Sequence, residues 1–354
     1  MIKRKKLIGC MVMFSLMATV LAGCGKKSDE EEKTSEQTLI DVGFSQLGAE
    51  SDWRIANTES IRNCLSNENG FNLTFDDAQQ KQDKQFIAMR KFIQQEKDCI
   101  VLAPVMEDGW DTVLQEAKDA GIPVIVVDRR VNVQDTRLVT AWVGSDFRKE
   151  ASIACEWLKS YTESNGIKPE ELFIVDIQGT LGATAQIERS DGLKNACEKY
   201  GWNLLEQVPA DYTQAKAKEV VSNLLKKYKD MNVVYCENDN EAIGAIEAIE
   251  ESGRKVGSNI SAGEIMIISF DATHSGLKMV MEGKIALDVE CNPLQGEEVA
   301  LLVKKVQNSD EFHRYTYVKE RAFSLDQTVK TVKLRDGDYE ITALTEDIIA
   351  DREY

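Results

Sequence analysis

The sequence is poor in histidine and lacks the short motifs on which many nucleotide-binding and hydrolytic enzymes depend. It has only two histidines, His274 and His313. Because no cysteines cluster beside them, we do not expect a zinc site. No G-x-G-x-x-G, P-loop or nucleophile elbow occurs, and no Ser/His or Cys/His pair follows a predicted strand. We therefore expect no catalytic residue, metal or cofactor, and these absences argue against the alternative of an enzyme.

The cysteines lack the C-x-x-C spacing of metal and redox sites. Cys10 and Cys24 lie in the N-terminal segment considered below. The other six are far apart, at apolar positions of predicted helices and strands: Cys64, Cys99, Cys155, Cys197, Cys236 and Cys291. A chain of this size does not need disulfides to fold. We expect most of these thiols to act as small buried apolar groups.

Positive charge is scarce as well. The chain has 43 Lys and Arg residues against 60 Asp and Glu residues, for a formal net charge of −17. Such a surface repels nucleic acid and anionic lipid, so neither is an expected partner. A neutral or cationic ligand is easier for this chain to accept than a polyanion.

The N-terminus reads as an export signal. A basic start, Lys3 to Lys6, precedes an apolar run over residues 7–20 that is too short for a spanning helix. The following Leu21-Ala22-Gly23-Cys24 resembles the lipobox of bacterial lipoproteins. We predict a signal peptide over 1–23, acylation of Cys24 and a flexible linker over 24–38. The protein would then be held by acyl chains at the extracytoplasmic face of the bacterial cell membrane; an ordinary signal peptide with a chance cysteine is the alternative.

From Leu39 onward, short β-branched runs alternate with amphipathic stretches. Strands are predicted over 39–44, 71–75, 98–102, 123–127, 172–176, 202–207, 232–235, 264–270 and 286–290, with helices between them. Strict alternation predicts parallel strands with helices on both faces. The pattern restarts near Thr140–Ser145, which predicts an α/β fold of two doubly wound parallel-sheet lobes. The charged stretches 226–230 and 247–254 are most simply solvated helix faces.

Polar and aromatic residues gather directly after the predicted strands, where open α/β sheets bind ligands. They are Ser45, Glu50, Trp53, Arg54, Asp128, Arg129, Arg189, Tyr212, Asn238, Asp271 and Asn292. Sugar hydroxyls both donate and accept, so carboxylate, amide and guanidinium groups suit them, and aromatic rings suit the C–H faces. This mixture predicts a monosaccharide ligand. Without further support, Asp128 and Asp271 could equally cap turns or helices.

The order and spacing of these segments resemble a known family. The matching stretches include Gly43-Phe44-Ser45-Gln46, Trp53-Arg54, Ala103-Pro104-Val105, Asp128-Arg129, Gln178-Gly179-Thr180, Asn238-Asp239 and Phe270-Asp271. Together they resemble the type I periplasmic binding proteins of the ribose/galactose class, and among these the galactofuranose-binding proteins of sugar ABC transporters. The resemblance extends from Val42 to about Val329.

The resemblance implies a role for each site residue and a three-segment hinge between the lobes. Asp128 and Arg129 would bind hydroxyls from the first lobe, Arg189, Asn238 and Asp271 from the second. Residues 39–141 and 294–318 would form the N-terminal lobe; 142–293 and 319–354 the C-terminal lobe. The implied protein is a monomer that delivers a galactofuranose-, galactose- or ribose-like sugar to a permease and its ATPase. A sugar-sensing receptor that presents its ligand to a membrane signalling partner is the alternative.

The sequence departs from the family at one ligand position. Ribose binders place a glutamine where this chain has Cys291, so Asn292 or Glu290 would have to substitute. Among the tryptophans, Trp110, Trp157 and Trp202 are expected in the core, whereas Trp142 sits at the proposed crossing. The tail over 330–354 has no clear counterpart, although Asp336-Gly337 predicts a turn between two short strands.

Overall fold

The computed structural model describes residues 38–354, which form one compact unit. The predicted signal peptide, Cys24 and the linker up to Gln37 lie outside the described residues. The expectations of export and acylation therefore remain predictions from the sequence.

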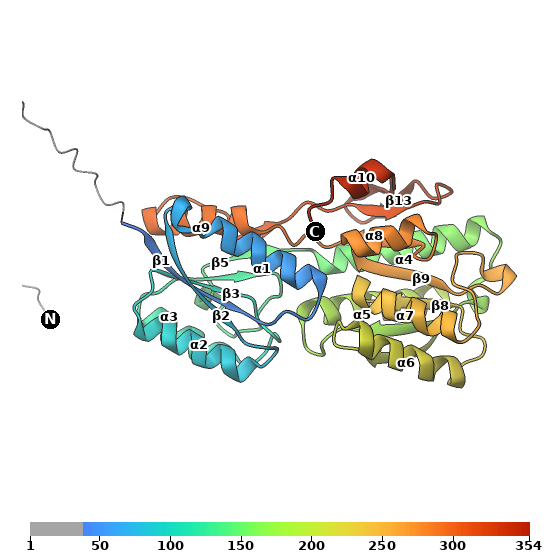
Figure 1. Ribbon diagram of the computed structural model, residues 1–354, viewed down its shortest axis with the longest axis horizontal. Coiled ribbons are helices and arrows are strands. Elements are labelled where there is room, and N and C mark those ends of the chain that lie inside the picture. The colour runs from blue at the N-terminus through green and yellow to red at the C-terminus, as the bar shows by residue number, and fades with distance from the viewer. Residues whose placement is uncertain (1–37) are drawn as a thin grey trace, which may run out of the picture. The chain divides into compact units, whose positions relative to one another are not determined.

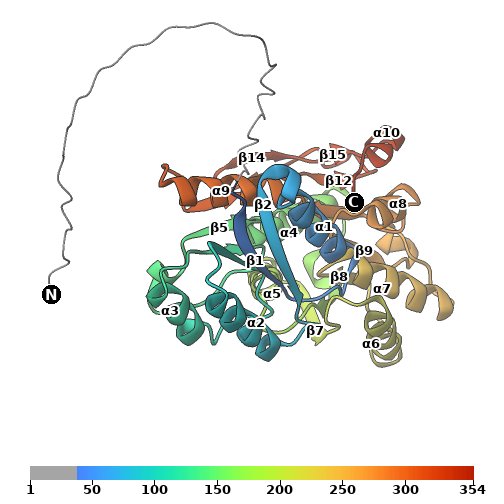
Figure 2. The same cartoon turned by 60° about the vertical axis from the view of Figure 1, so that its left-hand side comes forward.

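The first lobe is built on a sheet of order β11-β5-β4-β3-β1-β2, in which all neighbouring strands are parallel. Its strands are β1 (Ile40–Gln46), β2 (Phe71–Asp77), β3 (Cys99–Leu102), β4 (Val124–Val127), β5 (Ala141–Gly144) and β11 (Tyr315–Tyr317). Its helices are α1 (Asp52–Cys64), α2 (Gln82–Gln94), α3 (Asp111–Asp119) and α9 (Gly296–Asn308). In Figures 1 and 2, α1 and α9 cover one face of this sheet and α2 and α3 the other.

The second lobe is built on a sheet of order β15-β12-β10-β9-β8-β6-β7. Its strands are β6 (Phe173–Gln178), β7 (Asn203–Pro209), β8 (Val233–Cys236), β9 (Met266–Asp271), β10 (Leu287–Glu290), β12 (Ala322–Ser324) and β15 (Thr342–Ala343). Its helices are α4 (Phe147–Ser164), α5 (Thr184–Tyr200), α6 (Gln214–Lys227), α7 (Asp239–Glu251), α8 (His274–Met281) and α10 (Glu346–Ala350). The pair β10–β12 is antiparallel, and the other pairs of this sheet are parallel.

Both sheets are buried on both faces, as parallel sheets covered by helices should be. Every residue of β3, β4, β8 and β9 is buried. Successive side chains of a strand point to opposite faces. Val101 thus packs with α1 and α9, while its neighbour Leu102 packs with α2 and α3. In the second lobe, Ile174 packs with α4 and α5, and Val175 with α6 and α7.

Three segments connect the lobes. The first, Ser145–Asp146, leads from β5 to α4; the second, Cys291–Gln295, from β10 to α9; and the third, Val318–Arg321, from β11 to β12. We call them the first, second and third crossing. Because α9 and β11 return to the first sheet, each lobe is assembled from segments far apart in the sequence.

One boundary differs from the prediction. The sequence places the first crossing at Trp142, but β5 pairs with β4 and β11 and so belongs to the first sheet. Trp142 is 2% exposed, and its ring meets that of Tyr317 edge-on at 5.2 Å. The partner strand β11 follows 173 residues later, with Tyr315 opposite Trp142, so local periodicity could not place β5 in this sheet.

The tail packs on the second lobe. Strands β13 (Thr331–Leu334) and β14 (Gly337–Glu340) form an antiparallel hairpin whose two-residue turn is Arg335-Asp336, one residue before the predicted Asp336-Gly337. Val332 and Ile341 enter the core beside α4. The hydroxyl of Tyr354 donates to Glu290 at 2.7 Å. The tail is thus part of the folded lobe and reaches the strand that precedes the second crossing.

No helix within residues 38–354 is both long enough and apolar enough to cross a bilayer. The six cysteines in this range, most of which were expected to be small buried apolar groups, are all free thiols; five are buried and Cys64 is partly exposed.

Candidate functional site

A small cavity lies where the strand ends of the two lobes face each other. Its volume is about 30 Å³. The first lobe, the second lobe and the second crossing all contribute to its wall: Glu50, Ser51, Trp53, Arg54, Asp128, Arg129, Phe147, Ala185, Arg189, Tyr212, Asn238, Asp271 and Cys291. We call it the interlobe cavity.

A charge network from the first lobe forms one side of the interlobe cavity. Arg54 projects from the first turn of α1, where Ser51 accepts its backbone N–H as the helix N-cap. Its guanidinium contacts Glu50 at 3.1 Å and Asp128 at 2.6 Å. Arg129 donates to the carbonyl oxygen of Val105 at 2.7 Å and lies 3.7 Å from Glu50. Burial and the nearby Arg54 lower the pKa of Arg129. This side of the cavity thus holds two buried guanidinium groups close to two buried carboxylates.

Arg189 dominates the side formed by the second lobe. It projects from α5, is 2% exposed and donates to Glu150 at 2.8 Å through Nε. Its Nη2 lies 2.7 Å from the same carboxylate and 3.8 Å from Asp271. Burial raises the pKa of Asp271 well above its ordinary value although Arg189 opposes the shift. Asp271 makes no closer ion pair among the described residues, which leaves its carboxyl group available to a ligand.

Several polar atoms of the cavity wall have no hydrogen-bond partner within residues 38–354, although they are buried. They are Glu50 Oε2, Arg54 Nη1 and the Tyr212 hydroxyl. Leaving a buried donor or acceptor unsatisfied costs about 1–3 kcal/mol. These atoms come from both lobes and include donors and acceptors. A ligand with several hydroxyl groups would satisfy them together.

Apolar groups form the remaining wall. Trp53, Phe147, Ala185, Tyr212 and Cys291 pack together in one cluster. The Arg54 guanidinium lies 4.6 Å from the centre of the Trp53 ring, which holds this ring beside the polar network. The cavity therefore combines aromatic faces with charged groups, as a carbohydrate site requires.

Three residues of the cavity wall have a strained backbone. Asp128, Tyr212 and Asp271 have φ values of +62°, +62° and +107°. Such left-handed conformations are uncommon for residues other than glycine and persist where the surrounding fold imposes them. Each of these residues ends a parallel strand or follows one. Their side chains therefore lie at the sheet edge that faces the other lobe.

Most of the predicted site residues meet at this cavity. The structure brings together Glu50, Trp53, Arg54, Asp128, Arg129, Arg189, Tyr212, Asn238 and Asp271. Asn238 also caps α7 by accepting from the Glu241 N–H at 2.8 Å, so its carbonyl oxygen is already engaged.

Two predicted residues lie elsewhere. Ser45 is buried within β1, 3.5 Å from the amide of Gln85. Asn292 accepts from the N–H of Leu294 at 2.9 Å and thereby shapes the second crossing. Glu290, the other predicted substitute for the family glutamine, is bonded to Arg352 and Tyr354. Cys291 itself lies in the wall of the interlobe cavity. Ser51, Phe147 and Ala185 lie there too, although they were not predicted as site residues.

Larger hollows occur on the outside of the molecule. One of about 820 Å³ lies between α4, α5 and the β13–β14 hairpin. Its wall consists largely of exposed charged side chains such as Arg148, Lys149 and Asp336. It lacks the convergence of buried, unpartnered polar atoms from two lobes, which makes the interlobe cavity the candidate site.

The two doubly wound lobes and the polar cavity between them define the class of two-lobed binding proteins. Residues 42–309 match the family model described as "Periplasmic binding protein domain". The chain belongs to this family.

Individual relatives carry names that concern sugars. Over 258 residues, 72% of this chain and 78% of the relative, the chain is 38% identical to the galactofuranose-binding protein YtfQ of Escherichia coli K12. A Mycobacterium smegmatis structure in complex with β-D-fucofuranose matches with a TM-score of 0.76 and 40% identity, covering 82% of this chain and 92% of the other. The binding protein of the arabinose ABC transporter of Shewanella sp. ANA-3, bound to L-arabinofuranose, matches with a TM-score of 0.74 and 34% identity, covering 81% and 93%.

Proposed function

We propose that this chain is a lipid-anchored extracytoplasmic solute-binding protein that captures a monosaccharide between its lobes and delivers it to an ABC transporter permease. The observation that carries the proposal is the set of buried, unpartnered donors and acceptors that both lobes direct at one cavity. Hydroxyl groups of a sugar would satisfy them, and the Trp53 and Tyr212 rings would contact its C–H faces.

The relatives narrow the ligand class. Proteins at 34–40% identity are named for galactofuranose or are bound to fucofuranose or arabinofuranose. We propose a sugar of the galactofuranose or ribose type, with five-membered rings as the first candidates. Acylation of Cys24 would keep the monomeric protein at the membrane, close to the permease that receives its ligand.

Binding requires movement. In this conformation the interlobe cavity is small, about 30 Å³, and both lobes line it, so we infer that a monosaccharide enters only when the lobes move apart. We propose that the lobes separate about the three crossings, admit the sugar and close over it. The ligand would shift the population toward the closed form to the extent that it binds that form more tightly.

Isothermal titration calorimetry across a panel of furanoses and pyranoses tests the proposal. We expect saturable binding of at least one sugar, with one site per chain. Asp271→Ala should weaken it, whereas Asp310→Ala, which removes an exposed carboxylate after α9, should not. Absence of binding to every sugar of the panel would overturn the monosaccharide assignment.

A further inference from the structure

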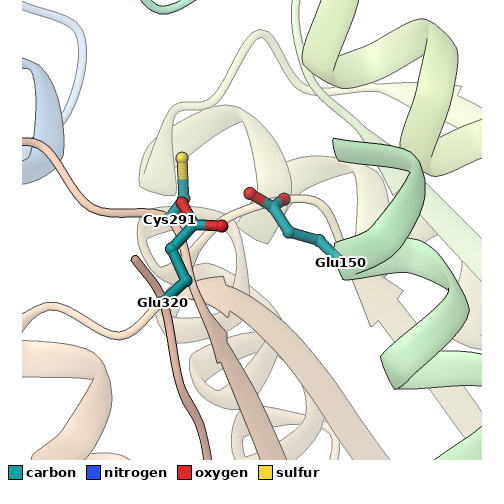
Figure 3. A group of neighbouring side chains, drawn as sticks. All are labelled: Glu150, Cys291 and Glu320. Carbon is teal, nitrogen blue, oxygen red and sulfur yellow. The ribbon is translucent and has the colours of Figure 1, made fainter. Parts of the chain in front are cut away.

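Apart from the proposed sugar site, the hinge contains a group of side chains of the types that bind cations. Glu150 on α4, Cys291 on the second crossing and Glu320 on the third each place one oxygen or sulfur atom within 4.8 Å of the others (Figure 3). Ser145, on the first crossing, lies beside them: its Oγ is 3.3 Å from Cys291 Sγ, and it donates to Glu320. We call Glu150, Cys291 and Glu320 the hinge cluster.

One oxygen of the hinge cluster lacks a partner. Glu150 is 1% exposed, and its Oε2 accepts from Arg189. Within the described part of the chain, Oε1 has no hydrogen-bond partner. Figure 3 shows this carboxylate pointing toward Cys291 and Glu320. A buried carboxylate oxygen without a partner is costly, and it faces two further potential ligand atoms.

The local charge favours a divalent cation. Two carboxylates and a thiolate would carry three negative charges, whereas Arg189 supplies one positive charge, which it shares with Asp271 at 3.8 Å. A divalent ion would offset two of the uncompensated negative charges. The neighbouring Glu290 does not alter this balance because Arg352 already pairs with it. Burial raises the pKa of Glu150 to about 7 and the pKa values of Glu320 and Cys291 well above their ordinary values, so without a cation it favours the protonated forms.

The hinge cluster has its own route to solvent. A hollow of about 800 Å³ opens at the hinge, and its wall includes Glu150, Asn292, Glu320 and Tyr339. It does not include Cys291, which faces the interlobe cavity. A cation could therefore reach the cluster without passing through the interlobe cavity.

We propose that the hinge cluster binds a thiophilic divalent cation such as Zn²⁺ through Glu150 Oε1, Cys291 Sγ and a Glu320 carboxylate oxygen. The Ser145 hydroxyl or a water molecule would complete a tetrahedral set. Sulfur among the ligands favours Zn²⁺ over Mg²⁺ or Ca²⁺. On binding, the Cys291 thiol loses its proton to solvent and the sulfur–metal bond forms.

The proposed ion would join the second and third crossings to α4. Arg189 and Cys291 each belong both to this arrangement and to the wall of the interlobe cavity. Cation and ligand would thus bias the same hinge, and any effect of one on the affinity of the other would be reciprocal.

Titration of the full-length protein with Co²⁺, a spectroscopic substitute for Zn²⁺, tests the site. We expect a near-ultraviolet thiolate-to-Co²⁺ band that saturates at one ion per chain and disappears when Zn²⁺ is added. Cys291→Ser should abolish the band, and Glu320→Gln should weaken Co²⁺ binding at least about tenfold. Cys64→Ala, which removes a partly exposed thiol on α1, should leave the band unchanged.

Two results would overturn the proposal: no thiolate band in the unaltered protein, or a band of full strength in Cys291→Ser. If Cys291→Ser fails to fold, Glu320→Gln carries the test because it retains the thiol. If the unaltered protein does not bind Co²⁺ and Glu320→Gln changes only the pH dependence of stability, the cluster binds a proton and not a metal. Since no sugar is needed, the outcome is independent of the proposed sugar binding.

Discussion

The indole Nε1 of Trp53 donates a buried hydrogen bond of 2.5 Å to the carbonyl oxygen of Cys291, 238 residues further along the chain. Trp53 lies on α1 of the first lobe and Cys291 on the second crossing. Contact between a ligand and the Trp53 ring would therefore be transmitted directly to the segment about which the lobes move.

Asp271→Ala should weaken sugar binding at least about tenfold, which corresponds to ~1.4 kcal/mol. The substitution would remove a hydrogen-bonding partner from the proposed site, and it would leave a hydroxyl of the enclosed sugar unsatisfied. The protein should remain folded because, within residues 38–354, the carboxylate forms an ion pair only with Arg189, at 3.8 Å. Calorimetry and circular dichroism would measure the two effects. Unchanged affinity for the best sugar would show that Asp271 does not bind it.

Tyr212→Phe should separate stability from binding. The buried Tyr212 hydroxyl has no partner among the described residues, so its removal should leave the free energy of unfolding unchanged or raise it by about 1 kcal/mol. Sugar affinity should fall several-fold if this hydroxyl binds the ligand. Urea denaturation and calorimetry would measure the two quantities.

Tyr161→Phe is the matched control. Its hydroxyl donates to the carbonyl oxygen of Ser258 at 3.2 Å, away from the interlobe cavity. We expect the opposite result: a loss of about 0.5–1.5 kcal/mol in stability and unchanged sugar affinity. Equal effects of the two substitutions on both quantities would contradict the assignment of Tyr212 to the site.

Stability should decrease as the pH rises from about 5 to 7.5. Burial raises the pKa of Glu150 from 4.5 to about 7, and it also raises the pKa values of Asp176, Glu237 and Glu241. Between the unfolded and folded pKa values, the folded protein binds more protons than the unfolded chain, so its relative stability is lost as these protons leave. Since one pKa unit is about 1.4 kcal/mol, the combined change should be several kcal/mol. Urea denaturation at both pH values would measure it.

Glu150→Gln should reduce this pH dependence because glutamine does not titrate. The decrease in stability between the two pH values should be smaller than in the unaltered protein, by up to a few kcal/mol. Asp310→Ala should preserve the full decrease, since this aspartate is exposed. A protein that gains stability over this range would show that the buried carboxyl groups are ionised in the folded state.

Cys24→Ala should release the protein from the membrane or leave it unprocessed, because the proposed acyl chains have no other attachment point. Fractionation of cells that express either form, followed by mass spectrometry of the N-terminus, would measure anchoring and processing. Mature Cys24→Ala protein that still sediments with the membrane would rule out the lipoprotein assignment.

The sequence predicted the alternation of strands and helices because each element carries its own signal. The continuous apolar runs of β3 and β4 and the amphipathic α2 need no distant partner to be recognised. Strand β5 was not predicted, and residues from Trp142 onward were assigned to the second lobe, because the edge partner β11 lies far along the chain. Prediction therefore succeeded where the signal was local.

The same difference between local and distant signals decided which site residues were predicted. Charged residues after strands, such as Asp128 and Asp271, were recognisable because they lie in stretches that resemble the family; their position after a strand alone would equally suit a cap of a turn or helix. Phe147 and Cys291 escaped selection because apolar residues at a cavity look like core residues. Asn292 was chosen one position away from Cys291, and only the course of the second crossing shows which of the two faces the cavity. The hinge cluster combines residues from three distant segments, so no spacing in the sequence could reveal it.

The small volume of the interlobe cavity has a kinetic consequence. Because both lobes line this small cavity, encounter and enclosure would be separate steps, and the ligand would first meet a wider form of the protein. At low sugar concentration the observed association rate would rise in proportion to concentration, but at high concentration it would level off at the rate of lobe motion. The hinge, and not diffusion, would then set how fast each molecule can be loaded.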